Sequence, residues 1–211
     1  MEFTEVQWTN RFTMELHLRY SCGENMPTNP IKKLFNVHEY RRMEDAGILS
    51  GRDRAELIYG EILVKGMPAP AHCASVDRIS LAMFRTAGDR AIVRTQGSVG
   101  LDEWNEPEPN VVLLRPKDDF YASKHPGPKD ILLIVEVSDS SLKYDRGTKA
   151  RLYAETGIPE YWVVDIRNDC LFAYSDICEK TYRLVRQYRR DDSIAPMFLP
   201  GSPIPIGTLL P

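Results

Sequence analysis

Glu136 is the residue whose position in the sequence most clearly calls for a chemical explanation. It lies in the apolar run Ile131-Leu-Leu-Ile-Val-Glu-Val137, which we expect to form a central strand buried on both faces. An ionised carboxylate in such surroundings is costly unless it is paired or binds a metal ion. Alternation places Leu132, Ile134 and Glu136 on one face, near the strand end where α/β proteins hold their sites. The residues leave two interpretations open, a functional site and a structural ion pair.

A basic residue that can reach this carboxylate lies on the next expected element. Asp145, Lys149 and Tyr153 follow one another at i,i+4 spacing, so they can line one face of a helix expected over about 144–156. Lys149 is the basic residue best placed to point back at the end of the strand. The alternative is a solvated salt pair that contributes little to stability.

Three further residues are candidates, each with a plain structural alternative. Asn110 ends the Pro-rich segment 106–110 at the lip of an apolar strand, where it could also open the strand through an Asx turn. Glu56 alternates with apolar residues, so it could simply face solvent. His72 stands at an expected helix start, where a histidine is more often a surface or capping group than a ligand.

The elements that position these residues follow from caps and periodicity. Asn36 and Glu39 have the spacing of a capping box, and Gly47 would end the helix that they open. A strand pair bent at Tyr59-Gly60, or one long bulged strand, is expected over 55–64, and a second helix over about 72–87. Further strands are expected at 91–95, 97–101, 111–114, 131–137 and 161–165, then a meander over 170–174 and 182–188 and an extended tail over 197–211, packed on the surface. This order predicts an α/β or α+β domain with a mixed central sheet.

Composition excludes several classes of protein. The chain has 27 Lys and Arg against 30 Asp and Glu, so we do not expect it to coat nucleic acid through bulk charge, although a local basic groove remains possible. No apolar run approaches the ~20 residues of a membrane span, and no signal peptide is visible, so we expect a cytoplasmic protein without membrane contact. The four cysteines are too widely spaced for a zinc site. Its length predicts one domain, which we place over 34–211, because residues 1–33 have weak periodicity and a loop composition that indicate an N-terminal appendage.

The ordered segments resemble a known family, and no competing catalytic motif is present. They resemble the Uma-two family of restriction-endonuclease-like proteins over about residues 37–188. The segments that carry the resemblance are His38–Gly47, Glu56–Glu61, the Pro-rich loop before His72, Glu106–Asn110, Glu136–Ser141, Asp145–Tyr153 and Gly157–Asp165. The resemblance implies a PD-(D/E)XK nuclease-like domain over 34–211, in which helices flank a mixed central sheet and a β meander follows.

The same resemblance implies a function and a set of site residues. It implies a hydrolase, an endonuclease that cleaves DNA with Mg²⁺ or Mn²⁺ and forms a homodimer. Glu56 and Glu136 match the acids that bind metal in the family, Asn110 occupies the position of its third metal ligand, and Glu136 and Lys149 match its catalytic residues. The parent nuclease motif has its lysine two residues after the strand Glu, and the family moves that lysine to the following helix, which is Lys149 here. His72 matches a histidine that recurs in the family.

One departure from the family pattern affects the expected activity. The family has Asp where this chain has Asn110, and a neutral amide lacks the charge that Mg²⁺ prefers. Because each ~1.4 kcal/mol of lost transition-state stabilisation lowers a rate tenfold, this change would lower activity by orders of magnitude. Two hypotheses follow. The chain is either a Mg²⁺-dependent DNA endonuclease or a catalytically impaired homodimer that acts as a nucleic-acid-binding or regulatory module.

Overall fold

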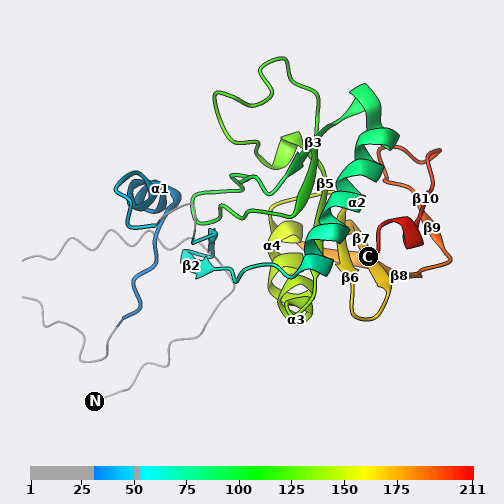
Figure 1. Cartoon of the computed structure of the whole chain (residues 1–211). Helices are drawn as coiled ribbons and strands as arrows, with labels where there is room; N and C mark the ends of the chain where they lie inside the picture. Colours follow the sequence, from blue (N-terminus) through cyan, green and yellow to red (C-terminus); the bar gives the residue numbers. More distant parts are fainter. Residues whose placement is uncertain (1–30, 50–52) are drawn as a thin grey trace, which may run out of the picture. The chain divides into compact units, whose positions relative to one another are not determined.

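A six-stranded mixed sheet lies at the centre of the computed structural model, which describes residues 31–49 and 53–211 (Figure 1). Its strands, in spatial order, are β3 (Ile92–Thr95), β4 (Val111–Leu114), β5 (Ile131–Ser138), β6 (Tyr161–Asp165), β7 (Cys170–Cys178) and β8 (Thr181–Arg189). β5 and β6 run parallel, and every other neighbouring pair is antiparallel. The expected appendage over residues 1–33 falls almost wholly outside the described residues.

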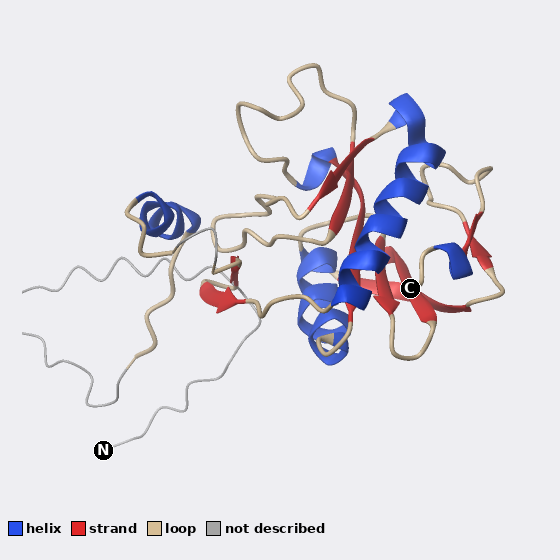
Figure 2. Ribbon diagram, viewed as in Figure 1, coloured by secondary structure: helices blue, strands red, loops and turns tan. Residues whose placement is uncertain are grey.

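Helices cover both faces of this sheet, as the sequence predicts (Figure 2). One face packs against α2 (Pro70–Ala87), whose buried stripe is Val76, Ile79, Met83 and Ala87. The other packs against a helical run made of α3 (Leu142–Tyr144), a π-helical segment (Asp145–Lys149) and α4 (Ala150–Glu155). None of the helices in the described ranges is long and apolar enough to cross a membrane.

The C-terminal tail belongs to the core, whereas we expected it to pack on the surface. It contains β9 (Ser193–Ile194), β10 (Ile204–Pro205) and the 3₁₀-helix η4 (Ile206–Thr208). Leu209 and Leu210 are fully buried in the same apolar cluster as α2. Two further 3₁₀ turns, η1 (Gly88–Arg90) and η2 (Pro128–Asp130), precede β3 and β5. The prolines keep the tail irregular, but its apolar residues still bury against the sheet.

Local signals in the sequence explain the N-terminal elements. Asn36 Oδ1 accepts the Glu39 backbone N–H at 2.8 Å and Glu39 Oε2 accepts the Asn36 backbone N–H at 3.0 Å, which is the expected capping box of α1 (Val37–Asp45). The segment 55–64 is a hairpin of β1 (Ala55–Ile58) and β2 (Glu61–Val64), not one bulged strand. Its two turn residues have positive φ, and a Cβ on Gly60 would lie 2.9 Å from Leu34 Cβ, so only glycine fits there.

Two sequence expectations about strands are wrong. Residues 97–101 form no strand, because their N–H groups pair singly with loop residues instead, as in Val99 to Pro107 and Leu101 to Asn105. A register shift pairs Leu113 with Leu133 but Leu114 with Ile131, so Leu132 packs with the α2 cluster rather than beside Ile134. The bulge lies near the start of β5, so it leaves the orientation of Glu136 unchanged.

Candidate functional site

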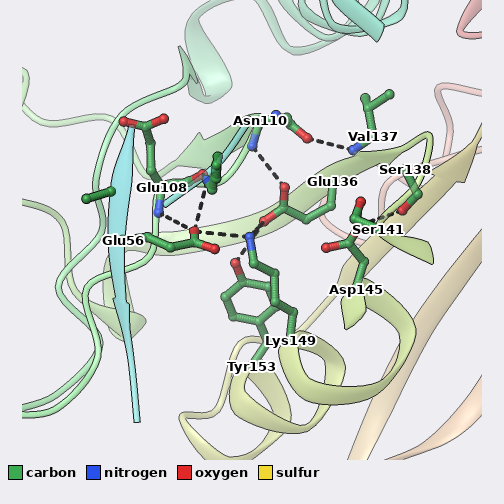
Figure 3. Close-up of polar contacts among 12 residues, drawn as sticks. Glu56, Glu108, Asn110, Glu136, Val137, Ser138, Ser141, Asp145, Lys149 and Tyr153 are labelled. Carbon is green, nitrogen blue, oxygen red and sulfur yellow. Dashed lines mark hydrogen bonds and ion pairs between the residues drawn. The ribbon is translucent and has the colours of Figure 1, made fainter. Parts of the chain in front are cut away.

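Glu136 is a buried carboxylate whose two oxygens both have partners. It extends from the C-terminal part of β5 toward the helical run, where Lys149 Nζ lies 2.8 Å from Oε1 (Figure 3). The Tyr153 hydroxyl donates to the same oxygen at 3.1 Å, and the Asn110 backbone N–H donates to Oε2 at 3.3 Å. Glu136 is 3% exposed and Lys149 2% exposed. These four groups meet the requirement that a buried charge be paired and hydrogen-bonded.

Glu56 joins the same cluster from β1. It is 2% exposed, so the solvent-facing alternative is wrong. Lys149 Nζ lies 3.2 Å from Glu56 Oε2, so one ammonium contacts two carboxylates that are 80 positions apart in the sequence. The hairpin is held there because Leu57 and Glu106 exchange backbone hydrogen bonds of 3.2 and 2.8 Å.

Asn110 lies beside Glu136, but its side-chain oxygen is engaged by the backbone. The residue directly precedes β4, and its Oδ1 accepts the Val137 backbone N–H at 2.8 Å (Figure 3). Because the Val137 N–H is a donor, it must face the oxygen and not the nitrogen of the Asn110 side chain, and this fixes the orientation of that amide. Asp at this position could accept the same hydrogen bond and would keep a second, charged oxygen. The structure therefore brings Glu56, Asn110, Glu136 and Lys149 together.

Asp145 has different partners from those that its i,i+4 spacing predicts. We expected Asp145, Lys149 and Tyr153 to line one face of an α-helix. The segment Asp145–Lys149 is instead π-helical, and Ser138 and Ser141 donate their hydroxyls to Asp145 Oδ2. π-Helical turns occur often at functional sites. This one turns Asp145 toward the end of β5 while leaving Lys149 and Tyr153 on Glu136.

Lys65 is a site residue that sequence reasoning missed. It follows β2, and its Nζ lies 2.9 Å from Glu56 Oε2 and donates to the Glu108 carbonyl at 2.6 Å. The Glu108 backbone N–H donates to the same Glu56 oxygen at 3.3 Å. A lysine at the end of a hairpin carries no local signal, because such residues are usually solvated. Only the folding of the hairpin over the sheet brings it to Glu56.

Opposite charges dominate the ionisation of this cluster. Burial alone would raise the pKa of Glu56, but the ammoniums of Lys149 and Lys65 outweigh it and hold that pKa below its usual value. Burial would likewise lower the pKa of Lys149, but Glu136 and Glu56 raise it. Burial, followed by the charge of Glu136, raises the pKa of Asp145 to about 6. Glu56 and Lys149 are therefore both charged at neutral pH.

An open cavity of about 420 Å³ lies over the cluster. Its walls come from the end of the β1–β2 hairpin, the start of α2 and the loop after β5, and Glu56, Glu136 and Lys149 line it. His72 and Tyr144 also line it, and two of their atoms, His72 Nδ1 and the Tyr144 hydroxyl, are buried without a hydrogen-bond partner among the described residues. Burial, followed by the charge of Arg54, lowers the pKa of His72. Buried polar atoms rarely lack a partner, so these two are candidates for hydrogen bonds to a water molecule or a ligand.

The two carboxylates would suit a magnesium ion held by only two protein side chains. Within the described ranges, no group of three or more His, Cys, Asp or Glu residues could hold a metal. Mg²⁺, however, commonly binds through one or two carboxylates, keeping several waters and contacting substrate phosphates. Glu56 and Glu136 provide two carboxylates, and the unsatisfied atoms of His72 and Tyr144 can hydrogen-bond to water or phosphate.

Comparison with known proteins identifies the family. The model of the Uma2 family, described as "putative restriction endonuclease", matches residues 37–207. A crystal structure of "a putative nuclease belonging to DUF820" from Anabaena variabilis ATCC 29413 has a TM-score of 0.62 at 15% identity, covering 83% of this chain and 97% of that chain. That likeness shows a shared fold. No curated protein matches the chain. Because the family model spans most of the sequence, this chain belongs to the Uma2 family of restriction-endonuclease-like proteins, as its motifs predict.

Proposed function

We propose that this protein is a metal-dependent endonuclease that hydrolyses phosphodiester bonds of DNA at the cluster of Glu56, Glu136 and Lys149. The observation that carries the proposal is the contact of one buried ammonium with two buried carboxylates below an open cavity. A buried ion cluster adds little to stability compared with well-packed apolar residues, so a functional role explains it better. Membership in a nuclease family supports a nucleic acid as the substrate.

Each residue has a role that its contacts support. Glu56 and Glu136 would hold Mg²⁺ or Mn²⁺, which when bound would activate water and neutralise charge on the phosphate. Lys149 orients Glu136 and places a fixed positive charge where negative charge develops on the phosphoryl group. Tyr153 acts through Glu136, whose Oε1 it holds, and is a positioning residue. His72 offers its unpaired Nδ1 to a phosphate oxygen or a water in the cavity.

A second function, also from the sequence, is favoured by one specific observation. Asn110 occupies the position of the Asp in the family pattern, so the site lacks that third carboxylate, and the one side-chain oxygen of Asn110 accepts a hydrogen bond from Val137. This supports the hypothesis that the protein is catalytically impaired and acts as a nucleic-acid-binding or regulatory module. The substitution Asn110→Asp separates the two functions. If the protein is impaired, the Asp variant gains Mn²⁺ binding or cleavage that the wild type lacks. If the wild type binds Mn²⁺ as well as the variant, this second function is ruled out.

A plasmid-nicking assay with Mg²⁺ or Mn²⁺ tests the proposed endonuclease. We expect metal-dependent nicking that falls at least about 100-fold in Glu136→Ala and Lys149→Ala, a loss of ~2.7 kcal/mol of transition-state stabilisation. Lys143→Ala is the matched control, because Lys143 is exposed on the same helical run. Equal activity in the wild type and both site variants would refute the proposal. The homodimer and the cytoplasmic location remain predictions, and light scattering tests the first.

A further inference from the structure

Lys65 differs from Lys149 in how firmly it is held. Both ammoniums contact Glu56 Oε2, at 2.9 and 3.2 Å. The side chain of Lys149 is 3% exposed and anchored in the helical run, where it also contacts Glu136. The side chain of Lys65 is 22% exposed and lies at the rim of the cavity. An exposed segment, which includes Met67 at 88% exposure, follows it.

Two ammoniums already pair with the two carboxylates that would hold the metal ion, and Arg54, Asp139 and Asp145 also line the cavity. Glu56 and Glu136 contribute two negative charges, and Lys65 and Lys149 contribute two positive charges. At Asn110 the chain lacks the negative charge that the family pattern would add. A divalent cation approaching Glu56 therefore meets an oxygen that accepts from three donors, which are the two ammoniums and the Glu108 backbone N–H. The cation must compete with the donor that can most easily move.

We propose that Lys65 is a built-in counter-ion that competes with divalent cations for Glu56 and keeps the affinity of the site for metal low. This inference rests on the proposed metal-dependent function, because it concerns the same carboxylates. Lys65 is the competing group because it is partly exposed and follows the end of the hairpin. Lys149 is buried between both acids, so it belongs to the site itself.

Calorimetric titration with Mn²⁺ tests the proposal without measuring cleavage. We expect Lys65→Met to bind Mn²⁺ at least tenfold more tightly than the wild type, and Lys65→Gln to behave similarly because it also removes the charge. Lys65→Arg keeps the charge and should bind as the wild type does. Adding Glu56→Gln to Lys65→Met should abolish the gain, which locates the metal ion. Circular dichroism confirms that each variant is folded.

The outcomes separate the inference from the proposed function. If Lys65→Met and Lys65→Gln bind Mn²⁺ no more tightly than the wild type, while the wild type binds measurably, Lys65 is not a competitor and the proposal is overturned. If Lys65→Arg gains as much affinity as Lys65→Met, the charge is irrelevant and the proposal fails too. If no variant binds Mn²⁺, Asn110→Asp included, the metal dependence itself fails, and the inference fails with it.

Discussion

Removing the ammonium of Lys149 should strongly destabilise the protein. Lys149→Met keeps most of the side-chain volume but leaves Glu136 without a cation, whereas Glu56 retains Lys65. Breaking one partner of a buried ion pair costs about 3–5 kcal/mol. Glu136 still accepts hydrogen bonds from Tyr153 and Asn110. We therefore expect the free energy of unfolding to fall by about 3 kcal/mol, near the lower end of that range.

Urea unfolding followed by tryptophan fluorescence measures this loss, because Trp162 is fully buried in β6. Lys143→Met is the control, and as a surface change it should shift stability by no more than about 0.5 kcal/mol. Adding Glu136→Gln to Lys149→Met removes the stranded charge and should recover at least about 1 kcal/mol. A loss below about 1 kcal/mol for Lys149→Met, or no recovery in the double variant, would refute this account of the cluster.

Three further predictions concern stability. Tyr153→Phe removes a buried hydrogen bond to the ionised Glu136 and should cost about 1.5–3 kcal/mol in urea unfolding; an unchanged midpoint would contradict that contact. Glu160 accepts from the Trp162 indole and the Met197 backbone, and burial raises its pKa to about 7 from the usual 4.5. Glu160 therefore holds an extra proton in the folded protein between these values, and its contribution to stability should fall as pH rises from about 4.5 to about 7, by at most ~1.4 kcal/mol per pH unit. Glu160→Gln should flatten this dependence, and an unaltered pH profile in that variant would rule the residue out as its source. Asn36→Ala removes the cap of α1 and should cost about 1 kcal/mol, whereas Asn36→Asp should keep most of the stability.

The strands and helices could be predicted where the signals are local. The capping box at Asn36, the stripe of α2 and the apolar run of β5 each depend on neighbours in the sequence, and the structure has all three elements. The absent strand at 97–101 and the bulge at Leu132 depend instead on pairing between distant segments. Period-two alternation carries no information about such pairing.

The candidate site likewise contains residues that local sequence signals predict and residues that only the packing of distant segments brings there. Glu136 could be predicted because a charged residue interrupts an apolar run. Lys149 could be predicted because it lies on the following helix, which can return it to the end of the strand. The burial of Glu56 and the approach of Lys65 depend on where the β1–β2 hairpin packs, which no local pattern specifies. The π-helical turn that redirects Asp145 inserts one residue into the hydrogen-bond spacing, and helical periodicity does not predict it.

A crystal of the protein soaked in manganese chloride gives the most direct test of the central claim, that Glu56 and Glu136 jointly hold a catalytic metal ion. The soak needs a high concentration, because Lys65 competes for Glu56. Our account predicts an anomalous-scattering peak in the cavity, within about 2–2.5 Å of oxygens from both carboxylates. A cavity that stays free of manganese, with both carboxylates still paired to Lys149, would contradict it.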